Sequence, residues 1–75
     1  MKKYTIYLFQ SNNNRPTTHY EVEGNVHDVN ASLLRFLPSF EFAMIEWITE
    51  EPWGLEIYHA VATYEDGEIN ITLDY

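Results

Sequence analysis

Histidines and carboxylates are the side chains of this 75-residue chain that could bind a metal ion. His19, Glu21 and Glu23 alternate along one predicted strand, so they share a face and offer nitrogen and oxygen ligands. Successive side chains on one strand face are about 6.6 Å apart, and three of them reach one ion only where the strand curves strongly. The spacing therefore favours a solvated strand face, and we expect neither a metal nor a cofactor.

Catalysis has little support in the sequence. The chain has no cysteine. No serine lies in a nucleophile elbow or triad context; the serines are Ser11, Ser32 and Ser39. Paired carboxylates work as acid and base only where one of them is desolvated, and we expect Glu50-Glu51 and Glu65-Asp66 in exposed turns. The sequence therefore predicts a protein that is not an enzyme.

The acid excess is the strongest remaining signal. Twelve Asp and Glu face four Lys and Arg, a formal net charge of −8. Such a surface is repelled by nucleic acid and by anionic membranes, so we expect no direct binding to either. It attracts a basic protein and speeds the encounter. The absence of cysteine and of a leader pattern leads us to expect a cytoplasmic location.

The carboxylates gather at three places along the sequence. Together with the aromatic side chain next to the second place, they give these candidate partner-binding residues: Glu21, Glu23, Glu50, Glu51, Trp53, Glu65, Asp66 and Glu68. Carboxylates two residues apart on a strand form a row of negative charge on the scale of a phosphate backbone. Whether the three places converge on one surface or ring the domain is open at this level.

The chain resembles, in general character only, the small, acidic, cysteine-free proteins of phages and mobile elements. Several of those act as nucleic-acid mimics against host defence. No specific motif carries the resemblance, so it assigns no residue. It implies a non-enzymatic inhibitor that blocks a basic, nucleic-acid-binding site on a partner protein. The alternative is a homo-oligomeric interaction module that uses exposed apolar strand surface.

The elements that position these residues begin with two strands, residues 4–10 and 17–23, joined by a polar loop. An amphipathic helix of about three turns follows, with Asn25 as N-cap and Asp28 as the capping-box acid. We expect Pro38 to end it. Its apolar residues recur at helical spacing: Val26, Val29, Leu33, Phe36 and Leu37.

Three further strands are predicted at residues 40–49, 55–64 and 68–75, with a break at residues 50–54 and a turn at Asp66-Gly67. The order ββαβββ predicts an α+β fold, with one amphipathic helix packed on a mainly antiparallel sheet. The whole chain, residues 1–75, is expected to form a single small domain.

The last hairpin allows two registers. A two-residue turn pairs Glu65 with Glu68 and His59 with Asp74. The core face is then Tyr58, Ala60, Ala62, Tyr64, Ile69, Ile71 and Leu73, where the two alanines leave space for the helix. A three-residue loop with a bulge pairs Val61 with Ile71. The core face is then Leu55, Ile57, Val61, Ile69, Ile71 and Leu73. We favour the first register because it pairs the histidine with a carboxylate.

A second apolar face is predicted on the sheet, since a single helix covers only one. In the third strand Phe42, Met44 and Ile48 oppose Ala43, Ile45 and Trp47. The uncovered face suggests a homodimer or a partner surface, or strand curvature and long loops cover it.

Overall fold

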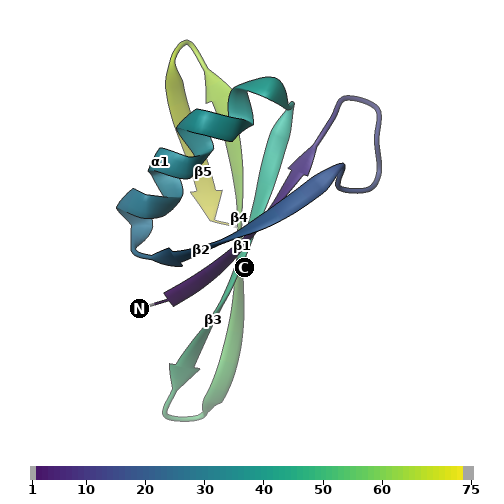
Figure 1. The fold of residues 1–75 in the computed structure, drawn as a ribbon. Coiled ribbons are helices and arrows are strands. Elements are labelled where there is room, and N and C mark those ends of the chain that lie inside the picture. The colour runs from purple at the N-terminus through teal and green to yellow at the C-terminus, as the bar shows by residue number, and fades with distance from the viewer. Residues whose placement is uncertain (1, 74–75) are drawn as a thin grey trace.

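One helix lies across one face of a five-stranded antiparallel sheet in the computed structural model, which describes residues 2–73 (Figure 1). The strands are β1 (Lys2–Phe9), β2 (Thr18–Gly24), β3 (Phe42–Glu51), β4 (Gly54–Glu65) and β5 (Glu68–Leu73). Helix α1 (Val26–Phe36) follows β2 and continues into a 3-10 turn, η1 (Leu37–Ser39). The sheet order is β2-β1-β3-β4-β5. The predicted α+β class and ββαβββ order are confirmed.

Helix α1 begins with the predicted capping box. The Asn25 side chain accepts hydrogen bonds from the amides of His27 and Asp28, at 2.9 and 3.2 Å. The Asp28 carboxylate accepts one from the Asn25 amide at 2.9 Å. Gly24 precedes the cap with φ +144°, and a Cβ there would overlap the Asp28 carboxylate. The α-helix ends at Phe36, and Pro38 lies within η1.

The core forms between α1 and the sheet. Val29, Leu33 and Leu37 point from the helix side onto the central strands. The buried residues beneath them are Tyr4, Ile6, Leu8, Ala43, Ile45, Ala60 and Ala62. Ala60 and Ala62 of β4 are buried on the helix side of the sheet, the face predicted for them.

The β4–β5 hairpin adopts the two-residue turn. Glu65 pairs with Glu68 and Ala62 with Ile71. Asp66 and Gly67 both have positive φ, 53° and 81°, which is the pattern of a type I′ turn.

The pairing of His59 with Asp74 stays a prediction, because Asp74 lies outside the described residues. Within those residues the His59 imidazole meets Glu46 of the neighbouring strand β3, with Nε2 3.2 Å from Oε2.

The predicted core face of this hairpin is only partly correct. Tyr64, Ile71 and Leu73 lie on the helix side of the sheet but are 40%, 41% and 52% exposed. Helix α1 contacts both edge strands of the sheet, β2 and β5, and the Tyr20 ring of β2 lies 5.1 Å from the Phe36 ring. The helix does not cover these three side chains completely, so they stay partly exposed.

The break predicted at residues 50–54 is also wrong in extent. Strand β3 continues to Glu51 and β4 begins at Gly54, so the turn is only Pro52 and Trp53. Because β1 pairs with β3 only from Phe42 to Trp47, residues 48–57 project beyond the rest of the sheet (Figure 1). The radius of gyration, 12.5 Å, exceeds the roughly 11 Å of a compact chain of this length. We call residues 48–57 the hairpin tip.

Candidate functional site

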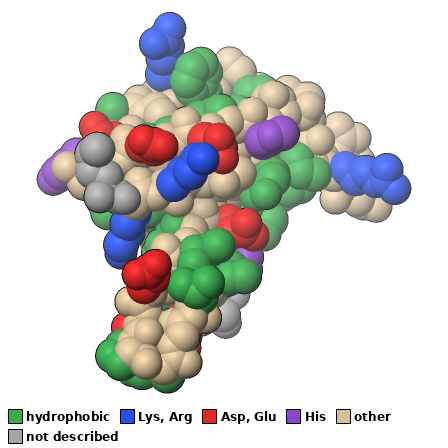
Figure 2. Space-filling model, turned by 60° about the horizontal axis from the view of Figure 1, so that its bottom comes forward, with side chains coloured by type: hydrophobic (Ala, Val, Ile, Leu, Met, Phe, Trp, Pro, Cys, Tyr) green, Lys and Arg blue, Asp and Glu red, His purple; other side chains and the backbone are tan. Residues whose placement is uncertain are grey.

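The predicted acidic places lie far apart in the fold. Glu50 and Glu51 end β3, whereas Glu65, Asp66 and Glu68 surround the turn at the opposite end of β4. A strand of this length holds its ends about 36 Å apart. Glu21 and Glu23 lie on β2, at the sheet edge opposite β5. Figure 2 shows acidic side chains spread over the visible face, with no single anionic patch there.

The β2 carboxylates face the neighbouring strand's lysine. Lys3 Nζ lies 3.5 Å from Glu21 Oε2, and Lys3 is the cross-strand partner of Glu23. Both side chains of the ion pair are more than half exposed, so it adds little stability. The pair nevertheless offsets part of the negative charge at this edge.

The metal hypothesis for β2 finds no geometry to support it. The His19 imidazole packs against the Tyr7 ring, with centroids 5.9 Å apart. Within residues 2–73 no group of three or more His, Cys, Asp or Glu side chains is arranged to hold an ion.

The carboxylates at the β4–β5 turn form a like-charge pair. Glu65 and Glu68 are direct cross-strand partners, and Asp66 lies between them in the turn. Such pairs are destabilising by a few tenths of a kcal/mol or more. This end of the hairpin has no large apolar side chain except Tyr64 and Ile69.

The hairpin tip carries four exposed apolar side chains, among them Trp53 and Leu55, the two most exposed large hydrophobic residues of residues 2–73. The exposed fractions are 53% for Ile48, 71% for Trp53, 69% for Leu55 and 58% for Ile57. The pairs Ile48–Ile57 and Glu50–Leu55 put the three aliphatic side chains on one face of the hairpin, the face away from α1. Figure 2 shows hydrophobic side chains at the end of the lobe at the bottom of the view.

Carboxylates border this apolar surface. Glu50 lies directly across from Leu55 on the same face, and the tip contains no Lys or Arg. Trp53 Nε1 donates to Glu56 Oε1 at 2.6 Å, which restrains the indole over the turn. The hairpin tip is thus both apolar and anionic.

The opposite side of the hairpin is polar. The Thr49 hydroxyl donates to Glu51 Oε1 at 3.1 Å. Desolvation and the nearby carboxylates of Glu56 and Glu51 raise the pKa of Tyr58, although a hydrogen bond with Thr49 opposes the shift. The carboxylates therefore supply negative potential on both sides of the hairpin.

The face of the sheet opposite α1 continues the apolar surface of the tip. We call it the open face; its central residues are Tyr7, Phe9, Phe42, Met44, Glu46, His59 and Val61. Phe9 and Phe42 stack at 4.6 Å, and the Tyr7, Met44 and Val61 side chains are half-buried. The second apolar face predicted for β3 is therefore present, with Ala43 and Ile45 buried on its other side.

The fold keeps the candidate residues in three separate groups, and only the group of Glu50, Glu51 and Trp53 lies beside exposed aliphatic side chains. Ile48, Leu55 and Ile57 belong with them, but sequence reasoning did not single them out as a site. The alternation of residues 55–58 next to a turn could have indicated an exposed apolar strand face. Finding the site also required the register of β3 on β4, which places Ile48 opposite Ile57.

Comparison with known protein families, curated proteins and solved structures finds no match to this chain. No helix within residues 2–73 is long and apolar enough to cross a membrane.

Proposed function

We propose that the chain is a non-enzymatic binding protein that inhibits a basic partner by inserting the hairpin tip into an apolar cleft with a basic rim. The observation that carries this proposal is the projecting tip itself. It presents Ile48, Trp53, Leu55 and Ile57 to solvent beside carboxylates, and residues 48–57 themselves contain no Lys or Arg. A monomeric domain gains nothing from exposing such a group, and clustered aromatic and aliphatic anchors are typical of interaction sites.

The carboxylates of the hairpin tip favour a basic partner. Once docked, Glu50, Glu51 and Glu56 lie at the edge of the buried apolar patch, where Lys or Arg of the partner can reach them. The net charge of −8 adds long-range attraction to a basic protein. A cleft lined by Lys and Arg that accepts nucleic acid fits this surface, and occupation of it by the hairpin would block the nucleic acid.

Affinity capture from a cell extract, followed by competition with nucleic acid, tests the proposal. The wild-type chain is compared with a double variant, Leu55→Ser and Ile57→Ser, and with a control variant, Leu34→Ser. Leu34 is also an exposed leucine, but it lies on α1. We expect the same basic protein to be retained by the wild type and the control, lost by the double variant, and released as salt rises.

The purified captured protein then decides whether binding is inhibition. Wild-type chain should displace its nucleic acid, and the double variant should not. Capture that is unaffected by the double variant, or binding that leaves the nucleic acid in place, contradicts the proposal.

A homodimer is the second candidate, and the open face is the observation that favours it. Two copies joined through this face would bury Tyr7, Phe42, Met44 and Val61, but they would also bring like carboxylates such as Glu46 close together. Salt screens that repulsion, so a dimer should strengthen as salt rises, whereas binding to a basic partner should weaken. Sedimentation at low and high salt separates the two functions.

A further inference from the structure

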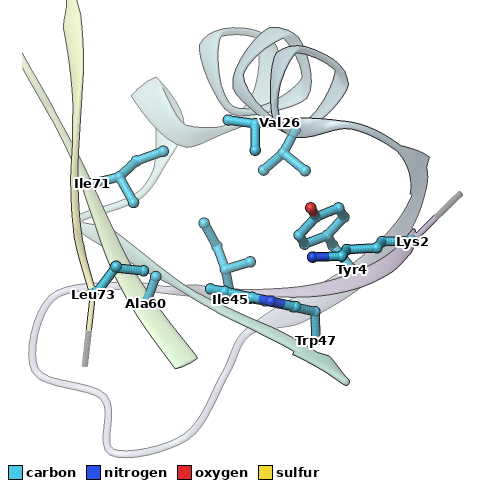
Figure 3. A pocket seen from close by; sticks show the side chains of 9 residues that line it. Lys2, Tyr4, Val26, Ile45, Trp47, Ala60, Ile71 and Leu73 are labelled. Carbon is cyan, nitrogen blue, oxygen red and sulfur yellow. The ribbon is translucent and has the colours of Figure 1, made fainter. Parts of the chain in front are cut away.

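A small pocket opens between the first turn of α1 and the sheet (Figure 3). Its volume is about 230 Å³. Apolar side chains from the helix and from three strands form most of its wall: Val26, Val29, Ile45, Ala60, Ile71 and Leu73. The small side chain of Ala60 leaves space on the sheet beneath the first turn of α1.

The hydroxyl of Tyr4 is the first sign of a ligand. The Tyr4 side chain is only 7% exposed, and among residues 2–73 its hydroxyl has no hydrogen-bond partner. Figure 3 shows the oxygen directed into the space below Val26. No buried side-chain oxygen or nitrogen of the described residues lacks a partner, so this hydroxyl is reached by solvent from the pocket. A ligand group that accepts its hydrogen bond would take the place of water there.

A cation lines the same pocket. Lys2 lines the pocket, and Figure 3 shows its ammonium on the same side of the space as Tyr4. Within the described residues Lys2 makes no ion pair, whereas Lys3 binds Glu21. The indole of Trp47 packs 5.6 Å from the Tyr4 ring and closes this side of the pocket. Among residues 2–73 no carboxylate lines this pocket, although Asp28 lines an adjoining one together with Lys2 and Tyr4.

We propose that the pocket binds a small monocarboxylate with an aliphatic or aromatic tail. The carboxylate accepts hydrogen bonds from Lys2 Nζ and the Tyr4 hydroxyl, and the tail fills the apolar space toward Ile71 and Leu73. A dry cavity of about 150 Å³ binds benzene, so the larger space here accepts a ring or a short chain. A charge-assisted pair of donors is the arrangement that selects a carboxylate over a neutral alcohol.

Titration with octanoate, followed by NMR of the backbone amides and of the indole N–H groups, tests this proposal. Octanol is the matched neutral probe. We expect saturable shifts at Tyr4, Trp47, Ala60 and Ile71, and binding of octanoate that is about tenfold tighter than that of octanol. The resonances of the hairpin tip should not move, which separates this site from the proposed docking surface.

Three variants test which side chains bind the carboxylate group of the ligand. Lys2→Met keeps the apolar stem, removes the charge, and should weaken octanoate about tenfold without changing octanol. Lys3→Met is the control, because its side chain lies on the other face of β1, and it should bind like the wild type. Tyr4→Phe should weaken octanoate several-fold while the unliganded protein keeps or gains stability.

Each contrary outcome overturns the proposal. Octanoate that causes no saturable shift at millimolar concentration removes the site. Octanol that binds as tightly as octanoate, or equal losses in Lys2→Met and Lys3→Met, removes the carboxylate specificity.

Discussion

Two adjacent leucines test which face of α1 packs on the sheet. Leu33 is fully buried against the central strands, whereas Leu34 is 46% exposed. Leu33→Ala and Leu34→Ala make the same chemical change at neighbouring positions of one helix, so the effect of helix propensity is equal in both. The difference between them reports burial alone.

The magnitude follows from the carbons removed. Deleting a fully buried leucine side chain to alanine costs about 2.7–5 kcal/mol, because the lost transfer free energy adds to that of the cavity. At Leu34 about half of the side chain is already in water, so we expect a cost of about 1 kcal/mol or less. A 75-residue domain has about 4–11 kcal/mol of stability in total, so Leu33→Ala should remove a large part of it.

Thermal unfolding followed by tryptophan fluorescence and circular dichroism measures both variants. The expected fall in midpoint temperature for Leu33→Ala is on the order of 20 °C, against a few degrees for Leu34→Ala. Equal losses in the two variants, or a Leu33→Ala protein within a few tenths of a kcal/mol of wild type, would refute this placement of the helix.

Three further outcomes follow from local contacts. Tyr20→Phe removes the 3.0 Å hydrogen bond to Ser32 and should cost about 0.5–1.5 kcal/mol at neutral pH. Burial raises the pKa of Tyr20 above 10.0. The stability that Tyr20 contributes is therefore complete below about pH 10 and is lost as the pH rises through the pKa of the folded protein. In urea unfolding at alkaline pH, Tyr20→Phe should lose less stability with rising pH than the wild type does. Asn25→Ala breaks the capping box with Asp28 and should cost about 1 kcal/mol in thermal unfolding, while a loss near zero would contradict the cap. Gly67→Ala forces alanine to φ +81° and should cost about 1 kcal/mol in the same assay.

The local elements were predictable because their signals are local. Asn25 and Asp28 fix the start of α1 through bonds within one turn, and Asp66-Gly67 specifies a two-residue turn through its backbone preference. This two-residue turn also sets the β4–β5 register.

The remaining features depend on contacts between distant segments. Glu50 and Glu51 read as a loop, yet they continue β3, because a projecting hairpin needs no buried side chains there. Nor does any local pattern reveal that α1 packs beside Tyr20 and also contacts β5. The pocket and the hairpin tip both arise from this long-range geometry, so neither could be read from composition or periodicity.

The sheet order has a consequence for how the chain folds during synthesis. Strand β1 lies between β2 and β3, but β3 is made more than thirty residues later. The first hairpin and α1 can form on the ribosome while the other edge of β1, with Ile6 and Leu8, still lacks its neighbour. An unpaired apolar strand edge is open to pairing with other chains until β3 arrives. The sheet cannot be completed before β3 is synthesised. Folding and aggregation therefore compete until β3 pairs with β1.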